Sequence, residues 1–467
     1  MSGGPDEPGQ APTPAGLDER GTLEEQIDLW RSWVLRRHAI TPDDAEELED
    51  NLRGRVDDLR AGGLDDDEAF LVAVKRMGGL DAVSREFARE HSERLWRQLV
   101  LVPDEPAATT TRLRDLGVLI ALAGACGLVV KALLGARDDT LLLANAAVAV
   151  LPFLAAYFAW SRRLPARVVV ALVALAAAPA LAVNLYPFAS PANDGPGMTF
   201  VLAATHLPVV LWLLLGVAYT GRWRSHARRM DFVRFTGELL IYLTLIAIGG
   251  SMLLGLTVAM FGVVNVSLEP FVEDWLMPFA GPGALFVAAW LVEAKKSVVE
   301  NMAPVLTRVF TPLTVVMLAA TLVVLLAHGS LVSVDRELLI LMDAVLVLVL
   351  ALLLYSISAR DPLAPRTWFD GLQLVLVVVA VAVNAVALSA MVSRTAEFGW
   401  TANKTAALGL NLVLLVHLVG TGWLVWRFLR GAGGFGAVER WQTRYLPVYA
   451  AWAAVVVLVF PPVFAFV

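Results

Sequence analysis

Long apolar stretches are the feature that most constrains this chain. Eleven runs of about 20 residues, each long enough to cross a bilayer as a helix, follow one another from residue 113 onward. They lie at 113–135, 140–160, 166–187, 198–220, 237–262, 276–294, 309–328, 338–358, 371–392, 403–428 and 446–467. The sequence therefore predicts an all-α protein with a polytopic membrane domain of about 11 transmembrane helices. The composition, 58% hydrophobic and 17% charged, excludes a water-soluble enzyme of the usual type.

The net charge of −6 hides a division of the chain into two parts. Residues 1–115 carry −11 and residues 116–467 carry +5. The tail, 1–21, is rich in Pro and Gly and lacks the basic and apolar regions of a signal peptide, so we expect it to be disordered. The prediction continues with a small helical domain at 22–100, a linker at 101–112 and the membrane domain at 113–467.

The small domain is predicted to contain four short helices with marked ends. Thr22 and Glu25 have the spacing of a capping box, and Thr41-Pro42 supplies a cap followed by proline at the first helical position. The second helix is expected to stop at Gly62-Gly63, and a third begins at Asp65. The expected core positions, which recur with helical spacing, are Ile27, Trp30, Val34, Ala45, Leu48, Leu52, Val56, Leu59, Ala69, Phe70, Ala73 and Val74.

Part of this domain resembles a known signalling module. The residues that carry the likeness are Ala45 to Leu52, Leu59, Gly63, Glu68-Ala69, Ala73 and Arg76-Met77-Gly78. They are similar to the bacterial permease-prefix domain and to the related helical signalling domain of the HAAS type. Asn51 stands where that family usually has His. The resemblance implies a small helical module that precedes a membrane domain and relays signals to a partner; the simpler alternative is a head that only folds and solubilises the N-terminal end.

The head also carries a predicted acidic face. Acidic side chains disfavour nucleic acid, because phosphate contacts need Lys or Arg, and they would be repelled by anionic lipid. A basic cytoplasmic regulator or another membrane protein would suit them, although a run of charges can also be a solvated face. The predicted partner-binding residues are Glu46, Glu47, Glu49, Asp50, Asp57 and Asp58.

Loop charge predicts the orientation of the membrane domain. With the N-terminus in the cytoplasm, the inner loops hold 17 Lys and Arg residues and the outer loops hold four, counting Lys404. Eleven spans would then place the C-terminus outside. We expect a multi-pass protein of the bacterial inner or plasma membrane, with the lipid bilayer as its constant partner.

The C-terminal third carries a second resemblance. The matching residues are Phe398 to Lys404, Leu410-Asn411-Leu412 and Arg444 to Tyr449. They look like a family of uncharacterised bacterial polytopic membrane proteins in which a Gly-x-Thr-x-Asn-Arg motif opens the penultimate span. Lys404 stands where that family usually has Arg, which keeps the charge and loses the planar fork. This likeness implies topology and no chemistry.

Polar groups within the spans are candidates for function, because an ionisable group is costly inside a bilayer. The candidate intramembrane site consists of Asp343, Lys404, His417, Asn403, Asn411, His206 and Glu238. One hypothesis pairs Asp343 with Lys404 in a polar interior that His417 also faces. The alternative is that Lys404 extends to the outer interface, and that each His forms an ordinary bond between helices.

The function predicted from these features is that of a non-enzymatic membrane sensor or transducer that signals through the acidic head; the alternative is a permease or transporter subunit for a small solute or lipid. No catalytic constellation, Walker motif, metal-ligand spacing or cofactor motif occurs in the sequence, so we expect no enzyme activity, no metal and no cofactor. The single cysteine, Cys126, lies in an apolar run and cannot form a disulfide within the chain.

Overall fold

The structure, a computed structural model, divides into two compact units, Met1–Thr109 and Thr110–Val467. It describes residues 23–24, 27–28, 31, 42–61, 64–66, 69–70, 73, 106–189, 196–294, 302–327, 336–360, 362 and 364–467. The boundary between the units falls within the predicted 101–112 linker. Part of that segment is helical, because α6 (Pro106–Gly135) already begins before the first apolar run.

In the first unit, α2 (Pro42–Ala61) begins at the predicted proline and ends before Gly62-Gly63. Its buried face carries Leu52 and Val56, which pack with Ile27, Ala69 and Ala73. These five side chains were expected in the core from their helical spacing. The predicted Thr22–Glu25 capping box and the predicted fourth helix of the head lie outside the described residues.

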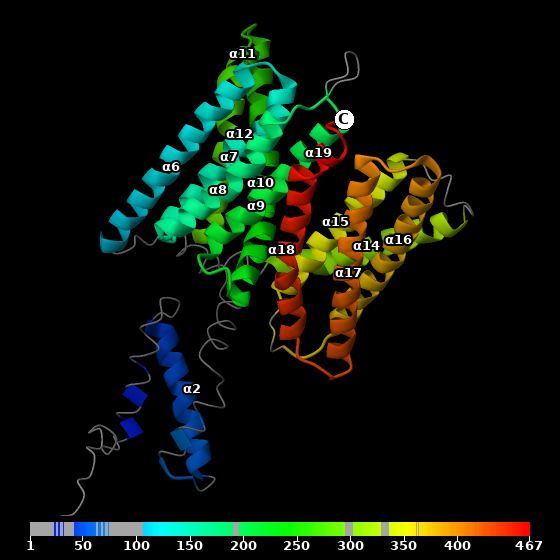
Figure 1. Cartoon of the computed structure of the whole chain (residues 1–467). Coiled ribbons are helices and arrows are strands. Elements are labelled where there is room, and N and C mark those ends of the chain that lie inside the picture. The colour runs from blue at the N-terminus through cyan, green and yellow to red at the C-terminus, as the bar shows by residue number, and fades with distance from the viewer. Residues whose placement is uncertain are drawn as a thin grey trace, which may run out of the picture. The chain divides into compact units, whose positions relative to one another are not determined.

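The second unit is a helical bundle, in which every regular element that the structure describes is a helix (Figure 1). After α6 the helices are α7 (Asp139–Ser161), α8 (Ala166–Leu185), α9 (Met198–Thr220), α10 (His226–Val263), α11 (Glu269–Phe271), the π-helix η1 (Val272–Leu276), α12 (Met277–Ala294), α14 (Met302–Ala327), α15 (Arg336–Ser358), α16 (Trp368–Phe398), α17 (Ala402–Leu429), α18 (Gly436–Leu458) and α19 (Phe460–Val463).

Ten helices among the described residues are long and apolar enough to cross a membrane, which confirms an all-α polytopic architecture. They correspond in order to the first ten predicted spans. The predicted eleventh span, 446–467, falls on α18 and α19. Helix α18 has 23 residues, a sufficient length, but its first half carries Arg440, Gln442 and Arg444 and is therefore less apolar than the other ten.

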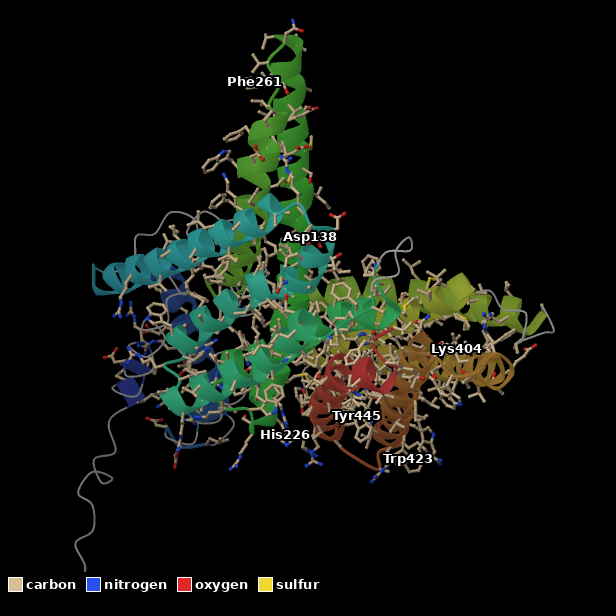
Figure 2. The ribbon with its side chains drawn as sticks, turned by 45° about the horizontal axis from the view of Figure 1, so that its top comes forward. Asp138, His226, Phe261, Lys404, Trp423 and Tyr445 are labelled. Carbon is tan, nitrogen blue, oxygen red and sulfur yellow. The ribbon has the colours of Figure 1, made fainter. Side chains whose placement is uncertain are left out.

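Two segments differ from the pattern of apolar runs. Helix α10 begins at His226, well before the predicted residue 237, because Ser225 caps it and its polar first turns continue the same backbone hydrogen bonds. The sixth predicted span, 276–294, also begins too late: α11, η1 and α12 form one continuous helical segment, Glu269–Ala294. Figure 2 shows the far end of α10, marked by Phe261, within a pair of helices that projects past the rest of the bundle.

The bundle has two main apolar cores. One is formed by α6, α7, α9, α10 and α12 around Phe158, Phe235 and Phe286. The other is formed mainly by α14 to α18 and includes Leu346, Ala380 and Leu418. Helix α18 packs against both α9 and α17, so it joins the two groups (Figure 1). Because α15, α16 and α17 share the second core, polar side chains on these three helices can meet inside it.

Candidate functional site in the membrane bundle

A polar cluster lies between α15, α16 and α17. The amide nitrogen Nδ2 of Asn411 on α17 donates to Oδ1 of Asp343 on α15 over 2.7 Å. The Asn384 amide on α16 donates to the backbone carbonyl of Asn411 over 3.3 Å. Asn384 and Asn411 are both fully buried, whereas Asp343 is half-buried. The structure therefore brings two of the predicted site residues, Asp343 and Asn411, into direct contact.

Apolar packing holds this cluster in place. Leu346 on α15, Ala387 on α16 and Leu414 on α17 are each buried a short distance along the helix from the polar residues. Asn411 also bonds back to the Ala407 carbonyl over 2.9 Å, which fixes its side chain against its own helix. A polar group in such a place is stabilised only by partners supplied by neighbouring helices.

The cluster contains more hydrogen-bond acceptors than donors. The side-chain oxygens Oδ1 of Asn384 and Asn411 are buried and accept no hydrogen bond in the described part of the chain. Among the described side chains, none of the Lys, Arg or His groups pairs with Asp343 at ion-pair distance. The carboxylate can take up a proton, and together with the two amide oxygens it supplies the oxygen ligands that a small hard cation prefers.

The predicted pairing of Asp343 with Lys404 is wrong. The Lys404 ammonium donates to the carbonyl of Gly399 over 3.0 Å and lies 5.5 Å from the centre of the Phe398 ring. The physical reason is the turn between α16 and α17. Gly399 takes a positive φ of 77° there, which exposes its carbonyl to the lysine in the first turn of the next helix. Lys404 thus extends toward the end of its helix, as the alternative described.

His417 belongs to a different cluster, at the interface of α17 and α18. Its Nδ1 lies 2.7 Å from the Tyr449 hydroxyl, and its ring stacks on Tyr445 with centroids 4.5 Å apart. Trp441 donates to the His417 carbonyl over 3.0 Å. The His417 side chain is fully buried, and its Nε2 has no hydrogen-bond partner among the described residues. It does not face Asp343 across a common polar interior, so that part of the expectation is also corrected.

The remaining candidates are dispersed. His206 bonds to the Leu202 carbonyl of its own helix, α9, over 2.8 Å. Glu238 is buried on α10, where it interacts electrostatically with Tyr355 of α15. Asn403 is half-buried in the first turn of α17. None of these three contacts the Asp343 cluster among the interactions of the described residues.

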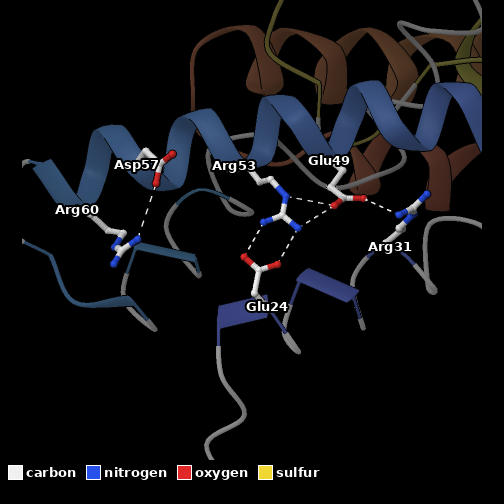
Figure 3. Close-up of polar contacts among 6 residues, drawn as sticks. All are labelled: Glu24, Arg31, Glu49, Arg53, Asp57 and Arg60. Atoms are coloured by element: carbon white, nitrogen blue, oxygen red, sulfur yellow. Dashed lines mark hydrogen bonds and ion pairs between the residues drawn. The ribbon is translucent and has the colours of Figure 1, made fainter.

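The acidic face of the head is more heterogeneous than expected (Figure 3). Glu46, Asp50 and Asp57 are exposed, and the side chains of Glu47 and Asp58 lie outside the described residues. Glu49 is only 8% exposed, and its carboxylate pairs with Arg53 at 2.9 Å and Arg31 at 3.2 Å. Glu49 therefore belongs to the internal ion-pair network of the head, and it is not free to bind a partner.

The residues predicted from the sequence do not include Asn384 beside Asp343, nor Tyr449 and Gln442 beside His417. Gln442 donates to Thr421, whose hydroxyl donates in turn to the His417 carbonyl. The signal that could have predicted this cluster is the polar residues, such as Gln442 and Tyr449, on the side of α18 that faces α17. That side could not be recognised before the partner helix of α18 was known.

No group of three or more potential metal-ligating His, Cys, Asp or Glu residues occurs in the part of the chain that the structure describes. No model of a known protein family, no curated protein and no solved structure shows a significant match to this chain.

Proposed function

We propose that this protein is a non-enzymatic, multi-pass membrane sensor that responds to a proton or a small monovalent cation at Asp343. One observation carries the proposal. The Asp343 carboxylate lies among membrane helices with an amide partner at 2.7 Å, two buried acceptor oxygens nearby and no cationic partner among the described residues. An ionisable group in such a place is costly for folding, which favours a functional reason for it.

The geometry supports a simple two-state response. When Asp343 is ionised, the Asn411 amide donates to it, as observed. When Asp343 is protonated, its hydroxyl can donate instead, and the Asn411 amide can turn over so that its oxygen accepts. A bound cation would likewise draw the amide oxygens toward the carboxylate. Either event changes the contact between α15 and α17.

Unbroken helices favour sensing over transport. In the described residues, α15, α16 and α17 each run without interruption past the polar cluster. Substrate sites of many secondary transporters are instead formed by discontinuous helices near the membrane midplane. The permease alternative would need a rearrangement of these helices.

The head is proposed to carry the output. Its likeness to permease-prefix and HAAS-type domains supports a relay to a cytoplasmic regulator, and the exposed Glu46, Asp50 and Asp57 would suit a basic partner surface. The excess of Lys and Arg in alternate loops supports a cytoplasmic N-terminus in a bacterial inner membrane.

Hydrogen–deuterium exchange of the full chain in lipid vesicles tests this proposal. We expect exchange in 336–358 and 402–429, and in the head helix 42–61, to change when pH or Na⁺ concentration is varied. Asp343→Asn should abolish the change, because the amide neither ionises nor binds a cation strongly. Glu397→Gln is the matched control, since Glu397 is an exposed carboxylate on the neighbouring helix α16.

An identical response in wild type and Asp343→Asn would contradict the proposal. A wild-type chain whose exchange is unaffected by both pH and Na⁺ would contradict it as well. Sustained proton or Na⁺ flux through vesicles, abolished by Asp343→Asn, would favour the permease alternative. The sensor predicts binding and conformational change without such flux.

A further inference from the structure

Three arginines, Arg229, Arg440 and Arg444, lie where the first turns of α10 meet the first half of α18. His226 of α10 has its Nδ1 3.2 Å from the Thr443 hydroxyl of α18, which joins the two helices. The Arg229 guanidinium lies one turn along α10, with Nη2 2.6 Å from the same His226 nitrogen. Figure 2 shows His226 at the same edge of the bundle as Tyr445 and Trp423, far from Phe261 at the other end of α10.

Positive charge accumulates at this junction. The charges of Arg229, Arg440 and Arg444 all act on His226, and that of Arg444 also acts on Arg229. Arg440 and Arg444 are exposed and lie four residues apart on α18, so they project from the same face of the helix. Arg229 is only 8% exposed, and its guanidinium lies 5.7 Å from the centre of the Trp223 ring.

The three arginines have no counter-ion in the described part of the chain. No described carboxylate pairs with any of them, and the buried Nε of Arg229 has no hydrogen-bond partner. Two other partly buried arginines of this bundle do have one. Arg162 pairs with Glu293 and Arg360 with Asp370, each at 2.7 Å. Burying a cation without an anion costs folding free energy. An anion from outside the chain that bound next to Arg229 would offset that cost.

We propose that Arg229, Arg440 and Arg444 form a binding site for a phosphate group. The two exposed guanidiniums would contact the phosphate oxygens directly, because their planar forks match such oxygens in pairs. Arg229 would attract the anion from beneath, and the Thr443 hydroxyl and His226 would fix the gap between the helices. The phosphate can come from the headgroup of an anionic phospholipid at the membrane surface or from free phosphate.

Binding to the purified full-length chain in detergent tests the site. Two probes are titrated separately, a short-chain phosphatidylglycerol and inorganic phosphate, with short-chain phosphatidylcholine as the lipid reference. Thermal unfolding and native mass spectrometry measure binding. We expect Arg444→Gln to weaken binding of the effective probe about tenfold, as for loss of a charge-assisted hydrogen bond, with a similar loss for Arg440→Gln.

Arg228→Gln is the matched control, because Arg228 is an exposed arginine on the first turn of α10 and its substitution changes the net charge equally. It should bind like wild type. Arg444→Lys should recover only part of the affinity, since it restores the charge without the fork. Arg440 and Arg444 are exposed, so their variants should fold.

The outcomes separate the two sources. Binding of phosphatidylglycerol alone supports a lipid headgroup site, and binding of inorganic phosphate with equal effect of the variants supports a free-phosphate site. The proposal is overturned if neither probe stabilises wild type more than phosphatidylcholine does. It is also overturned if Arg228→Gln weakens binding as much as Arg444→Gln, because the attraction would then be a general effect of net charge.

Discussion

At the scale of single residues, the polar groups in this bundle bond to neighbours that their own sequence position does not reveal. Asp343 finds Asn411, which lies 68 positions away in the chain. Lys404 lies only seven positions from Asn411 on the same helix, yet its ammonium does not join this contact. It donates to the backbone carbonyl of Gly399 instead. The Asp343–Lys404 pair was predicted from charge complementarity alone. In the structure, the turn at Gly399 offers its carbonyl to Lys404, and the ammonium bonds there and not to Asp343.

Glycine positions on α17 show how closely that helix packs against α18. A Cβ added at Gly409 would overlap the Trp452 ring, and one at Gly420 would overlap Trp441. Small residues let two membrane helices approach in this way. The close approach also brings His417 within reach of Tyr449, so the packing of these glycines positions the histidine cluster.

We predict that Gly409→Ala destabilises the bundle by about 1–3 kcal/mol, because the added methyl group forces Trp452 out of its place. Unfolding in detergent, followed by tryptophan fluorescence, measures the loss. Gly250→Ala is the control, since no atom lies within 4 Å of the Cβ it would add on α10. An equal effect of the two substitutions would argue against the Gly–Trp contact.

At the scale of elements, ion pairs connect α2 to the segment before it. Arg53 donates to both oxygens of Glu24, over 2.7 and 2.8 Å, and also to Glu49 on its own helix (Figure 3). The hydrogen bond to Arg53 lowers the pKa of Glu24 below its ordinary value of 4.5. The same bonds raise the pKa of Arg53. Both charges are therefore favoured by the folded head.

The sign of the resulting pH dependence follows from the lowered pKa. A carboxyl whose folded pKa is depressed contributes stability above its unfolded pKa, and loses it as pH falls through the folded pKa. We therefore predict that α2 in the full chain becomes more sensitive to an acid-active protease as pH falls below about 4.5. Because this pair is exposed, the effect should be small and reduced by salt.

Glu24→Gln should reduce this pH dependence and, when digested with a protease active at neutral pH, should leave α2 less resistant to cleavage than in wild type. Glu46→Gln is a suitable control, because Glu46 is an exposed carboxylate on the same helix. A steeper acid transition in Glu24→Gln than in wild type would contradict the role of the pair.

Sequence patterns predicted which helices form, and in which order, more successfully than the residues at which those helices begin and end. The apolar runs gave ten helices in the right order, and Pro42 marked the start of α2. They missed the first turns of α10, because hydropathy detects only the apolar part of a helix whose hydrogen bonds also continue through polar residues. They also could not show that η1 joins α11 to α12 without a break.

At the scale of the whole molecule, α18 is the element on which the topology depends. It is 23 residues long, about 34 Å as an α-helix, and packs against α9 and α17. We expect it to cross the membrane despite its polar first half, because Gln442 and Thr443 are fully buried against protein. Its crossing would put the C-terminal residues on the opposite side from the α17–α18 turn.

Single cysteines test this topology, because the native Cys126 is fully buried and should not react. We predict that Arg224→Cys and Ala432→Cys are labelled by a membrane-impermeant thiol reagent from the cytoplasmic side, and Thr401→Cys and Val467→Cys from the other side. All four positions are exposed. Labelling of residues 432 and 467 from the same side would show that α18 does not cross.

The sequence by itself determined the class of the protein, the order and approximate length of its membrane helices and the helical core of its head. These properties are local: a run of apolar residues or a cap determines them within about 20 positions. Only the tertiary structure decided which polar groups meet. His226 and Thr443 are separated by 217 residues, and Asp343 and Asn411 by 68. Such contacts depend on how each helix is rotated and which helix lies beside it, and packing of the complete bundle sets both.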